Sequence, residues 1–251
     1  MFATMELQEI LYTQGFGTRR VCMGLVQQGL VAVETKGNDW VLCQDAFAEF
    51  EPLNFSFKVQ GQVWAFHAKA YVLLNKPAGT ECSQKPSTYP SVYTLLPSPL
   101  RQRPVKGAVQ GIQAVGRLDQ DTTGMLLLSD DGQFIHRMAS PKKHVPKVYE
   151  VHTKHPISAE QIERLLAGVV LDDDPKPVAA AACLQISEHR LDLTLTEGKY
   201  HQVKRMLAAV GNRVESLHRS RIGAFSMPAH LQPGQWMWLD SLALEQITQS
   251  A

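Results

Sequence analysis

Residues 114–128 read Ala114-Val115-Gly116-Arg117-Leu118-Asp119-Gln120-Asp121-Thr122-Thr123-Gly124-Met125-Leu126-Leu127-Leu128. The second half of this stretch is a short apolar run, which is typical of a buried strand. Asp119 and Asp121 lie in the tight connection that enters this strand, and catalytic side chains are common on loops held by a rigid sheet. An aspartate pair in a turn also has an ordinary structural explanation, because Asp favours turns and helix caps.

The surrounding sequence predicts an α+β domain. Apolar runs and alternating patterns indicate strands, and capping residues followed by apolar stripes indicate helices. The expected elements are a strand at 71–74, a helix capped by Asp131, a strand at 147–152, a helix that begins with a capping box at Ser158, strands at 178–186 and 190–196, a helix at 200–210 and a strand at 213–222. Residues 69–251 are therefore expected to form the main domain.

A smaller domain is expected over residues 1–50. Leu7, Ile10 and Leu11 share one helical face, and Thr18 can cap a second helix. A strand at 30–33 follows that helix. Residues 51–68 are expected to be a linker that carries another strand.

Composition and charge narrow the class of protein. The 251 residues are 44% hydrophobic and 20% charged with a net charge of +1, which is ordinary for a soluble globular chain. No apolar run approaches the roughly 18 residues of a spanning helix, and the N-terminus lacks the pattern of a signal peptide. A cytoplasmic protein without membrane attachment is expected. Because the four cysteines are scattered, neither a metal site nor a disulfide is expected.

The charges are unevenly distributed along the chain. Residues 1–68 are net acidic, whereas basic residues are densest at 199–221, where only Glu215 opposes them. A basic surface of this kind attracts phosphates, although a single run of charges is more commonly a solvated face. The basic residues of this run are Lys199, Lys204, Arg205, Arg213, Arg219 and Arg221.

Four blocks in the same order carry a family resemblance. Residues 116–128 resemble the signature G-R-L-D-x-D-[ST]-x-G-L-L-L-[LM] of the pseudouridine synthases that act on ribosomal RNA. Blocks at 74–79, 140–151 and 197–219 agree with the same family, and the match covers about residues 70–240. Tyr200-His201-Gln202-Val203-Lys204-Arg205-Met206 is more similar to the small-subunit branch than to the large-subunit branch, which reads Asn-Arg-Gln-[IV]-Arg-Arg there.

The resemblance implies an α+β catalytic domain with a mixed, mostly antiparallel sheet, preceded by a small S4-like α/β RNA-binding domain. It implies that Asp119 is the catalytic carboxylate, that Tyr149 packs on the target uracil and that Lys204 pairs with the aspartate, with Arg205 as the adjacent alternative. The other residues expected to contact RNA are Arg117, Asn75, Lys76, Lys147, His201, Gln202, Arg205, Arg19 and Arg20.

The implied reaction breaks the N1–C1′ bond of a uridine and joins C5 to C1′. It needs no external reactant, so no metal or organic cofactor is expected. Asp119 either bonds C1′ covalently or takes a C2′ proton to give a glycal, and the sequence leaves both routes open. The expected partner is ribosomal RNA, either small-subunit rRNA or a ribonucleoprotein assembly intermediate, bound by a monomer.

Three other functions fit parts of the pattern. A large-subunit rRNA pseudouridine synthase would have the same chemistry. A non-catalytic RNA-binding or ribosome-assembly protein would have no need of Asp119, Tyr149 and Lys204 together. A glycoside hydrolase that uses Asp119 and Asp121 is disfavoured, because no second acid lies in a separate element opposite the first.

Overall fold

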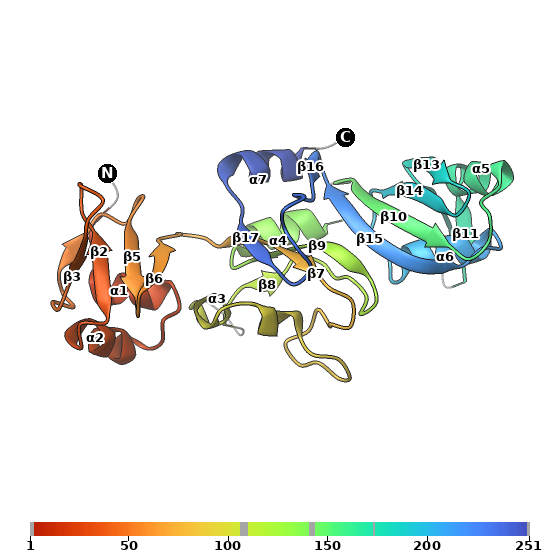
Figure 1. Cartoon of the computed structure of the whole chain (residues 1–251). Coiled ribbons are helices and arrows are strands. Elements are labelled where there is room, and N and C mark those ends of the chain that lie inside the picture. The colour runs from red at the N-terminus through yellow and green to blue at the C-terminus, as the bar shows by residue number, and fades with distance from the viewer. Residues whose placement is uncertain (1–2, 106–109, 141–143, 173, 250–251) are drawn as a thin grey trace. The chain divides into compact units, whose positions relative to one another are not determined.

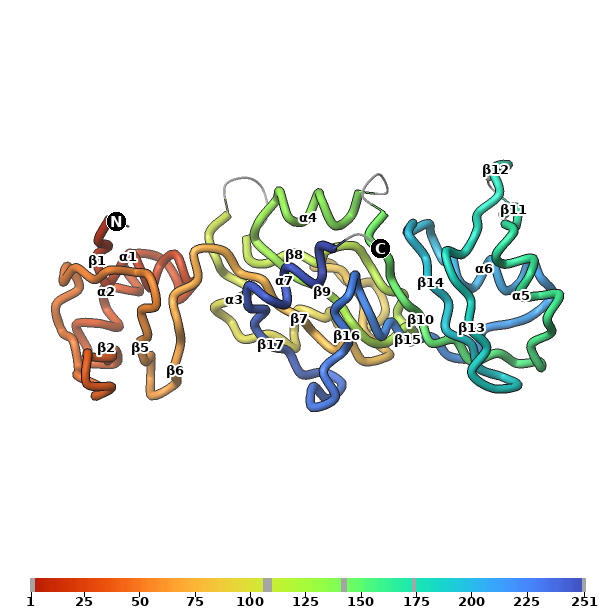
Figure 2. Tube along the Cα trace, turned by 90° about the horizontal axis from the view of Figure 1, so that it is seen from above, coloured from red at the N-terminus to blue at the C-terminus, as the bar shows by residue number. Residues whose placement is uncertain are grey.

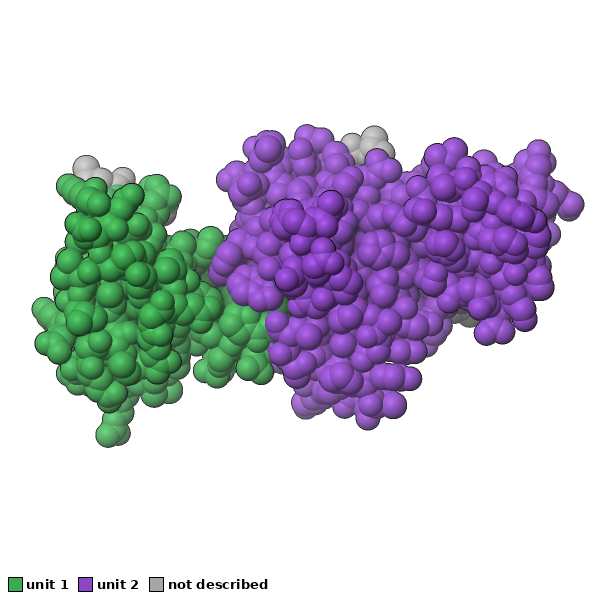
Figure 3. Space-filling view, in the orientation of Figure 1, with its two compact units in different colours: residues 1–70, 96–113 green, residues 71–95, 114–251 purple. Residues whose placement is uncertain are grey.

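The computed structural model describes residues 3–105, 110–140, 144–172 and 174–249. The chain divides into two compact units, which are residues 1–70 with 96–113 and residues 71–95 with 114–251 (Figure 3). The motif block at 140–151 is thus described apart from residues 141–143, which lie outside the described ranges.

The first unit packs short helices on a small antiparallel sheet. Its helices are α1 (Leu7–Thr13), α2 (Arg19–Gln27) and α3 (Ser98–Gln102). Its strands are β1 (Met5–Glu6), β2 (Val31–Glu34), β3 (Trp40–Leu42), β4 (Glu49–Phe50), β5 (Ser56–Val59) and β6 (Gln62–Ala65). The main sheet has the order β3-β2-β5-β6, and β1 pairs with β4. Leu7, Ile10 and Leu11 bury their shared helical face against Phe57, and Thr18 caps α2 by accepting from the Val21 N–H.

A buried arginine holds residues 96–113 in this unit. Arg103 is 2% exposed and donates to Gln14 Oε1 at 2.8 Å and to the His67 carbonyl at 2.6 Å. Gly15 has φ +89°, and a Cβ there would collide with the Pro99 carbonyl. Only glycine allows this approach, so α3 packs against the α1–α2 turn although Gly15 and Pro99 are 84 residues apart in the sequence (99 − 15).

The second unit is built on one mixed sheet with the order β13-β14-β10-β15-β9-β7-β17 (Figures 1 and 2). Neighbours along this order are antiparallel, except that β15 and β9 are parallel. The strands are β7 (Tyr71–Lys76), β9 (Thr123–Ser129), β10 (Lys147–Thr153), β13 (Ala182–Ser187), β14 (Arg190–Leu195), β15 (Val214–Ile222) and β17 (Trp236–Trp238). The predicted class, α+β with a mixed and mostly antiparallel sheet, is confirmed.

Helices and short elements complete the second unit. They are the 3-10 helix η1 (Val92–Leu95), the helices α4 (Gly132–Ala139), α5 (Ala159–Ala167), α6 (Gln202–Ala209) and α7 (Ser241–Thr248), the hairpin β11 (Val169–Leu171) and β12 (Asp174–Val178), and β16 (Phe225–Ser226). The two-residue β8 (Gln113–Ala114) lies where the chain passes from one unit to the other.

The core of the second unit lies between the β7–β9 part of the sheet and two helices. Phe134 of α4 and Ile247 of α7 pack with Leu73 of β7 and Met125 and Leu127 of β9. The apolar run that follows Asp119 is therefore a central, buried strand, as its composition predicts. This strand gives the preceding loop a rigid base.

Several elements differ from the sequence-based expectations. The strand expected at 178–186 is interrupted, because β12 ends at Val178 in a hairpin with β11 and β13 begins only at Ala182. The alanines at 179–182 carry no periodic signal that would reveal this break. The helix expected at 200–210 begins at Gln202. Helices α3 and α7 and strand β17 were not expected.

Candidate active site

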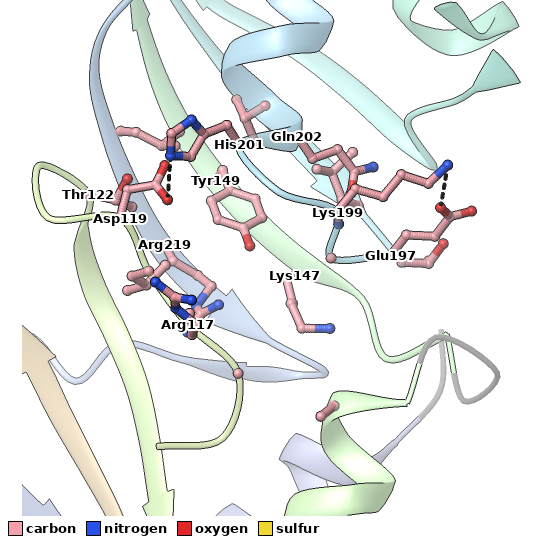
Figure 4. A pocket seen from close by; sticks show the side chains of 18 of the residues that line it. Arg117, Asp119, Thr122, Lys147, Tyr149, Glu197, Lys199, His201, Gln202 and Arg219 are labelled. Carbon is pink, nitrogen blue, oxygen red and sulfur yellow. Dashed lines mark hydrogen bonds and ion pairs between the residues drawn. The ribbon is translucent and has the colours of Figure 1, made fainter. Parts of the chain in front are cut away.

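A pocket in the second unit collects most of the predicted site residues (Figure 4). Its volume is about 150 Å³, below the roughly 300–1,000 Å³ of pockets that enclose drug-sized ligands, so it suits a single planar base. Its polar lining residues are Arg117, Asp119, Thr122, Ser140, Lys147, Tyr149, Thr196, Glu197, Lys199, His201, Gln202, Lys204 and Arg219.

The register of two neighbouring strands places three of these side chains on one face of the sheet. Tyr149 of β10 lies directly opposite Arg219 of β15, and residues opposite each other in an antiparallel pair point to the same face. Lys147 is two residues before Tyr149, so it also points to that face. A register shift between Val148 and Tyr149 marks a local irregularity at this point of the ladder. Figure 4 shows these side chains directed into the pocket.

A glycine brings the Asp119 loop to the same place. Gly124, at the start of β9, is paired in parallel with Arg219 of β15. Its φ is +102°, and a Cβ there would collide with the backbone of Arg219. Only glycine permits both the backbone angle and this close approach. The loop that carries Asp119 therefore enters the sheet immediately beside Arg219.

A buried lysine fixes this loop from beneath. Lys76, at the end of β7, has no exposed surface, and burial lowers the pKa of its ammonium group. Its Nζ donates to the carbonyls of Thr122 at 2.9 Å, Pro77 at 3.1 Å and Gln120 at 3.3 Å. The Gly79 N–H also donates to the Gln120 carbonyl, at 2.8 Å. The turn after β7 thus holds the backbone on which Asp119 and Asp121 are mounted.

Replacing Lys76 with Met is expected to lower the free energy of unfolding by about 2 kcal/mol, because three carbonyls lose a charged donor. Pseudouridine formation is expected to slow as well, because the Asp119 loop loses its support. Chemical denaturation and single-turnover rates measure the two effects. Lys85→Met is the matched control, since Lys85 is an exposed lysine of the same unit. Equal stability of the two variants would contradict the supporting role of Lys76.

Asp119 lies close to two side chains at the start of helix α6, those of the N-cap residue His201 and of Lys204. One carboxylate oxygen is 3.2 Å from His201 Nε2 and the other is 3.3 Å from Lys204 Nζ. Lys204 also donates to both oxygens of Asp121, at 2.7 and 2.9 Å. One ammonium group therefore holds both aspartates of the motif.

The charges in this cluster shift the pKa values of two groups. Burial raises the pKa of Asp121, but the hydrogen bond and the charge of Lys204 outweigh it, and the net shift is downward. Burial lowers the pKa of Lys204, whereas the hydrogen bond to Asp121 and the charge of Asp119 raise it, and the net shift is upward. The cluster thus favours an ionised Lys204 beside an ionised Asp121.

The start of α6 has an unusual backbone that aims His201 at Asp119. His201, the N-cap residue, has φ 47° and ψ 33°, in the left-handed region that L-residues rarely adopt. The side chain of Gln202 is 5% exposed and accepts from the Lys199 N–H at 2.9 Å, which closes the turn before the helix. The ring of Tyr200 stacks on that of His201, with centroids 3.8 Å apart. Strained backbone of this kind is typical of functional sites.

Burial gives Lys147 an unusual pKa, near 8. Desolvation is the main cause of the decrease and the positive charge of Arg219 adds to it, while Nζ donates to the Val145 carbonyl at 3.0 Å. Lys147 therefore lies close to the point of losing its charge at neutral to slightly alkaline pH.

This pKa predicts a pH effect on folding. The pKa of Lys147 is about 8 in the folded protein and 10.5 in its ordinary state, so between these values the unfolded chain binds a proton that the folded chain does not. The free energy of unfolding is therefore expected to rise with pH across this window. The rise should be smaller in Lys147→Met, as measured by urea denaturation at several pH values. A rise of the same size in both proteins would contradict this expectation.

The structure brings some of the predicted residues together and separates others. Asp119, Tyr149, Lys204, Arg117, Lys147, His201 and Gln202 line the pocket. Arg205 points elsewhere and donates to the Tyr200 carbonyl at 3.2 Å. Lys76 and Asn75 were predicted to contact RNA, but they are 0% and 6% exposed, and Asn75 Nδ2 donates to the Leu231 carbonyl at 2.7 Å. Their burial fits a supporting role and does not fit direct contact with RNA.

The two arginines predicted at the start of α2 lie in the first unit. Arg19 is bound to Glu9 by contacts of 2.7 and 2.9 Å and lies over the ring of Tyr12, whereas Arg20 is exposed. The charge of Arg19 is thus partly neutralised.

Among the pocket residues that were not predicted as site residues, two polar ones are buried. Arg219 and Thr122 line the pocket and are 3% and 1% exposed. Arg219 stood in the 197–219 block, and its spacing from Tyr149 could not reveal that the two face each other. Only the strand register does.

The chain belongs to the family of RNA pseudouridylate synthases. Residues 70–209, more than half of the chain, match the model of that family, whose description is RNA pseudouridylate synthase. The protein is accordingly an RNA pseudouridine synthase, as the four motif blocks predict. Within the described ranges, no helix has the length and apolar character needed to cross a membrane.

Relatives and a solved structure agree with this family. The chain is 37% identical over 236 residues to an uncharacterized RNA pseudouridine synthase of Bacillus subtilis, a match that covers 92% of this chain and 93% of that protein. It is 41% identical over 170 residues to ribosomal small subunit pseudouridine synthase A of Escherichia coli K12, covering 68% and 70% of the two chains. The corresponding protein of Vibrio cholerae is 37% identical, covering 94% and 96%.

A crystal structure described as a pseudouridylate synthase has the same fold. The TM-score is 0.66 with 29% identical residues, and the match covers 97% of this chain and 99% of the solved one. The agreement over nearly the whole length of both chains supports the fold class independently of the sequence motifs.

Proposed function

We propose that this protein converts a specific uridine of small-subunit ribosomal RNA to pseudouridine, with Asp119 as the catalytic carboxylate. The observation that carries the proposal is the position of Asp119 in a base-sized pocket, held by Lys204 at 3.3 Å and His201 at 3.2 Å. The names of the relatives from E. coli and V. cholerae support the small-subunit target. A large-subunit rRNA target is the alternative.

The uridine must leave its stack to reach this pocket. Removing a base from a stack costs a few kcal/mol, and an aromatic contact offsets part of that cost. Tyr149 provides an aromatic ring inside the pocket, on the same face of the sheet as Lys147 and Arg219. In the proposed complex, the ring of Tyr149 packs on the uracil and Asp119 meets the ribose.

Asp119 acts on the ribose by one of two routes. In the first, the carboxylate attacks C1′ as the N1–C1′ bond breaks. In the second, it removes the C2′ proton and a glycal forms. Before the reaction, the ammonium group of Lys204 balances the negative charge of the loop. The contact with Asp121 fixes the position of the Lys204 side chain.

The predicted domain roles complete the proposal. Residues 1–50 act as an S4-like RNA-binding domain, and the catalytic domain predicted at 69–251 corresponds to the second unit. The structure corrects the predicted bounds, because residues 51–68, expected to be a linker, contain β5 and β6 of the first unit's sheet, and residues 96–113 also belong to the first unit. Exposed Arg20 supports RNA contact by the S4-like domain, whereas the Arg19–Glu9 pair weakens it. The protein acts as a cytoplasmic monomer on rRNA or on an assembly intermediate.

The test uses the purified chain without added factors. Small-subunit rRNA, large-subunit rRNA and assembling small-subunit particles are each incubated with the protein, and pseudouridines are mapped by carbodiimide labelling and primer extension. A new pseudouridine confined to small-subunit rRNA or its particles is expected. Modification confined to large-subunit rRNA would show that large-subunit rRNA is the target. Binding without any modification would support a non-catalytic role.

A further inference from the structure

The pocket contains two buried polar atoms that lack hydrogen-bond partners within the described part of the chain. They are Nη2 of Arg219 and Oγ1 of Thr122. The guanidinium group of Arg219 is held in place from its other side, because Nε donates to the Met125 carbonyl at 2.7 Å. Unpaired buried donors are costly and rare in native proteins, so a fixed donor at a pocket wall indicates a ligand that accepts from it.

A second donor group lies on the same face of the sheet. Lys147 uses one hydrogen bond on the Val145 carbonyl, and an ammonium group has three donors. The positive charge of Arg219 adds to the effect of burial in lowering the pKa of Lys147. An electron-rich ligand between the two groups would offset that effect.

We propose that Arg219, together with Lys147, donates hydrogen bonds to the exocyclic oxygens of the target uracil and stabilises the base as an anion while it is detached from the ribose. The inference rests on the proposed function, and it deepens it by assigning the residues that recognise the base. The donor to O4 also selects uracil over cytosine, because cytosine presents an amino donor at that position, whereas both bases have O2.

The charge balance requires such a group in either route. When the N1–C1′ bond breaks, both electrons remain with the base, whose negative charge spreads over N1, O2 and O4. Asp119 becomes neutral at the same moment, either as an ester to C1′ or as an acid that holds the C2′ proton. The charge thus moves from Asp119 to the base. It returns to Asp119 when C5 bonds to C1′, because the ester bond to C1′ breaks in the first route and Asp119 gives its proton back to C2′ in the second. C5 then loses its proton and N1 gains one.

The positions of the side chains match this movement of charge. Asp119 contacts Lys204 of helix α6 and the N-cap residue His201, whereas Arg219 and Lys147 belong to the sheet strands β15 and β10. One cationic group faces the carboxylate before the bond breaks, and a different one is available to the base afterwards. Donors placed in advance where charge develops are the main source of catalysis in many enzymes.

The test combines a substitution in the protein with the replacement of one uracil oxygen by sulfur. The substrate rRNA is transcribed with 4-thiouridine or with 2-thiouridine in place of uridine, because sulfur is a much weaker acceptor than oxygen. Single-turnover rates are measured for the wild type and for Arg219→Gln. On ordinary RNA, Arg219→Gln is expected to be slower by about 10²-fold, the usual effect of removing one preplaced donor to a developing anion.

The decisive result is the response to sulfur. One of the two thio substitutions should slow the wild type at least about tenfold, and the same substitution should cause little further loss in Arg219→Gln, since interacting groups give non-additive effects. Arg221→Gln, which removes an exposed charge from the same strand, should keep the full thio effect. Equal thio effects in wild type and Arg219→Gln, or no thio effect in the wild type, would overturn the inference.

Two further measurements separate the possible failures. Arg219→Lys keeps the charge and is expected to recover part of the rate, which excludes misfolding as the cause of the loss. Binding of uridine monophosphate and of cytidine monophosphate is measured by ligand-observed NMR, which requires no turnover. A wild type that modified no rRNA would contradict the proposed function. Selective binding of uridine monophosphate that depends on Arg219 would still support the recognition of uracil. Equal binding of both nucleotides would count against the recognition itself.

Discussion

Replacing Asp119 with Asn is expected to abolish pseudouridine formation while leaving folding and RNA affinity close to those of the wild type. The amide has nearly the same shape, but it can neither attack C1′ nor remove a proton from C2′. A loss of about 10⁴-fold or more in the single-turnover rate is expected, as for other enzymes that lose their nucleophile. Stability should change little, because Asp119 is partly exposed and Lys204 keeps its contacts with Asp121.

Asp121→Asn is the matched control for this experiment. The two aspartates lie on one loop and contact the same lysine, yet only Asp119 lines the pocket. A loss of at most about tenfold is expected for Asp121→Asn, in the range of weakening one partially exposed contact. If Asp121→Asn were inactive and Asp119→Asn restored modification in a null strain, the assignment of the catalytic carboxylate would be wrong.

Replacing Lys204 with Ala is the second change with a large expected effect. It removes the ammonium group that holds both Asp119 and Asp121, so two carboxylates remain on one loop without their main counter-charge. We expect the single-turnover rate to fall by about 10²–10³-fold, because the carboxylate is less well positioned and less well compensated. Asp121, whose pKa Lys204 lowers, should titrate at higher pH in the variant.

Lys204→Arg and Arg205→Ala distinguish this positioning role from a general loss of positive charge. Lys204→Arg should recover much of the rate. Arg205 lies next to Lys204 on the same helix but donates to the Tyr200 carbonyl, so Arg205→Ala should change RNA affinity and its salt dependence more than the single-turnover rate at saturating enzyme. A greater loss of that rate in Arg205→Ala than in Lys204→Ala would mean that the wrong cation has been chosen.

Local sequence patterns predicted the elements that build the second unit. The apolar run after Asp119 is strand β9, the alternation at 147–152 is β10, and the capping box at Ser158 begins α5 with both of its hydrogen bonds formed. These predictions were correct because the spacing of apolar residues and the capping of helices depend on residues close together in the sequence. The prediction of one continuous strand at 178–186 was wrong, because the alanines there show no periodic pattern that would reveal the break.

Contacts between distant segments could not be predicted in this way. Asn75 and Lys76 were expected in a turn, but they are the last two residues of strand β7. Lys76 is fully buried because its ammonium group donates to three carbonyls. Arg219 is one basic residue among several in its stretch, and only the pairing of β15 with β10 and β9 puts it in the pocket. The sequence gives the chemical type of each residue, but the residues that it contacts depend on the tertiary fold.

The parallel pairing of β9 with β15 also bears on the order of folding. It joins Thr123 and Gly124 to His218 and Arg219, so roughly 95 residues must be looped out before these strands can meet. Pairings across such long separations are slow to form, because the entropy of closing the loop is lost before the contacts are made. On a translating ribosome, the antiparallel pair of β7 and β9 can form early, whereas the pocket cannot exist until β15 has emerged. The nascent chain therefore stays inactive until its synthesis is nearly complete.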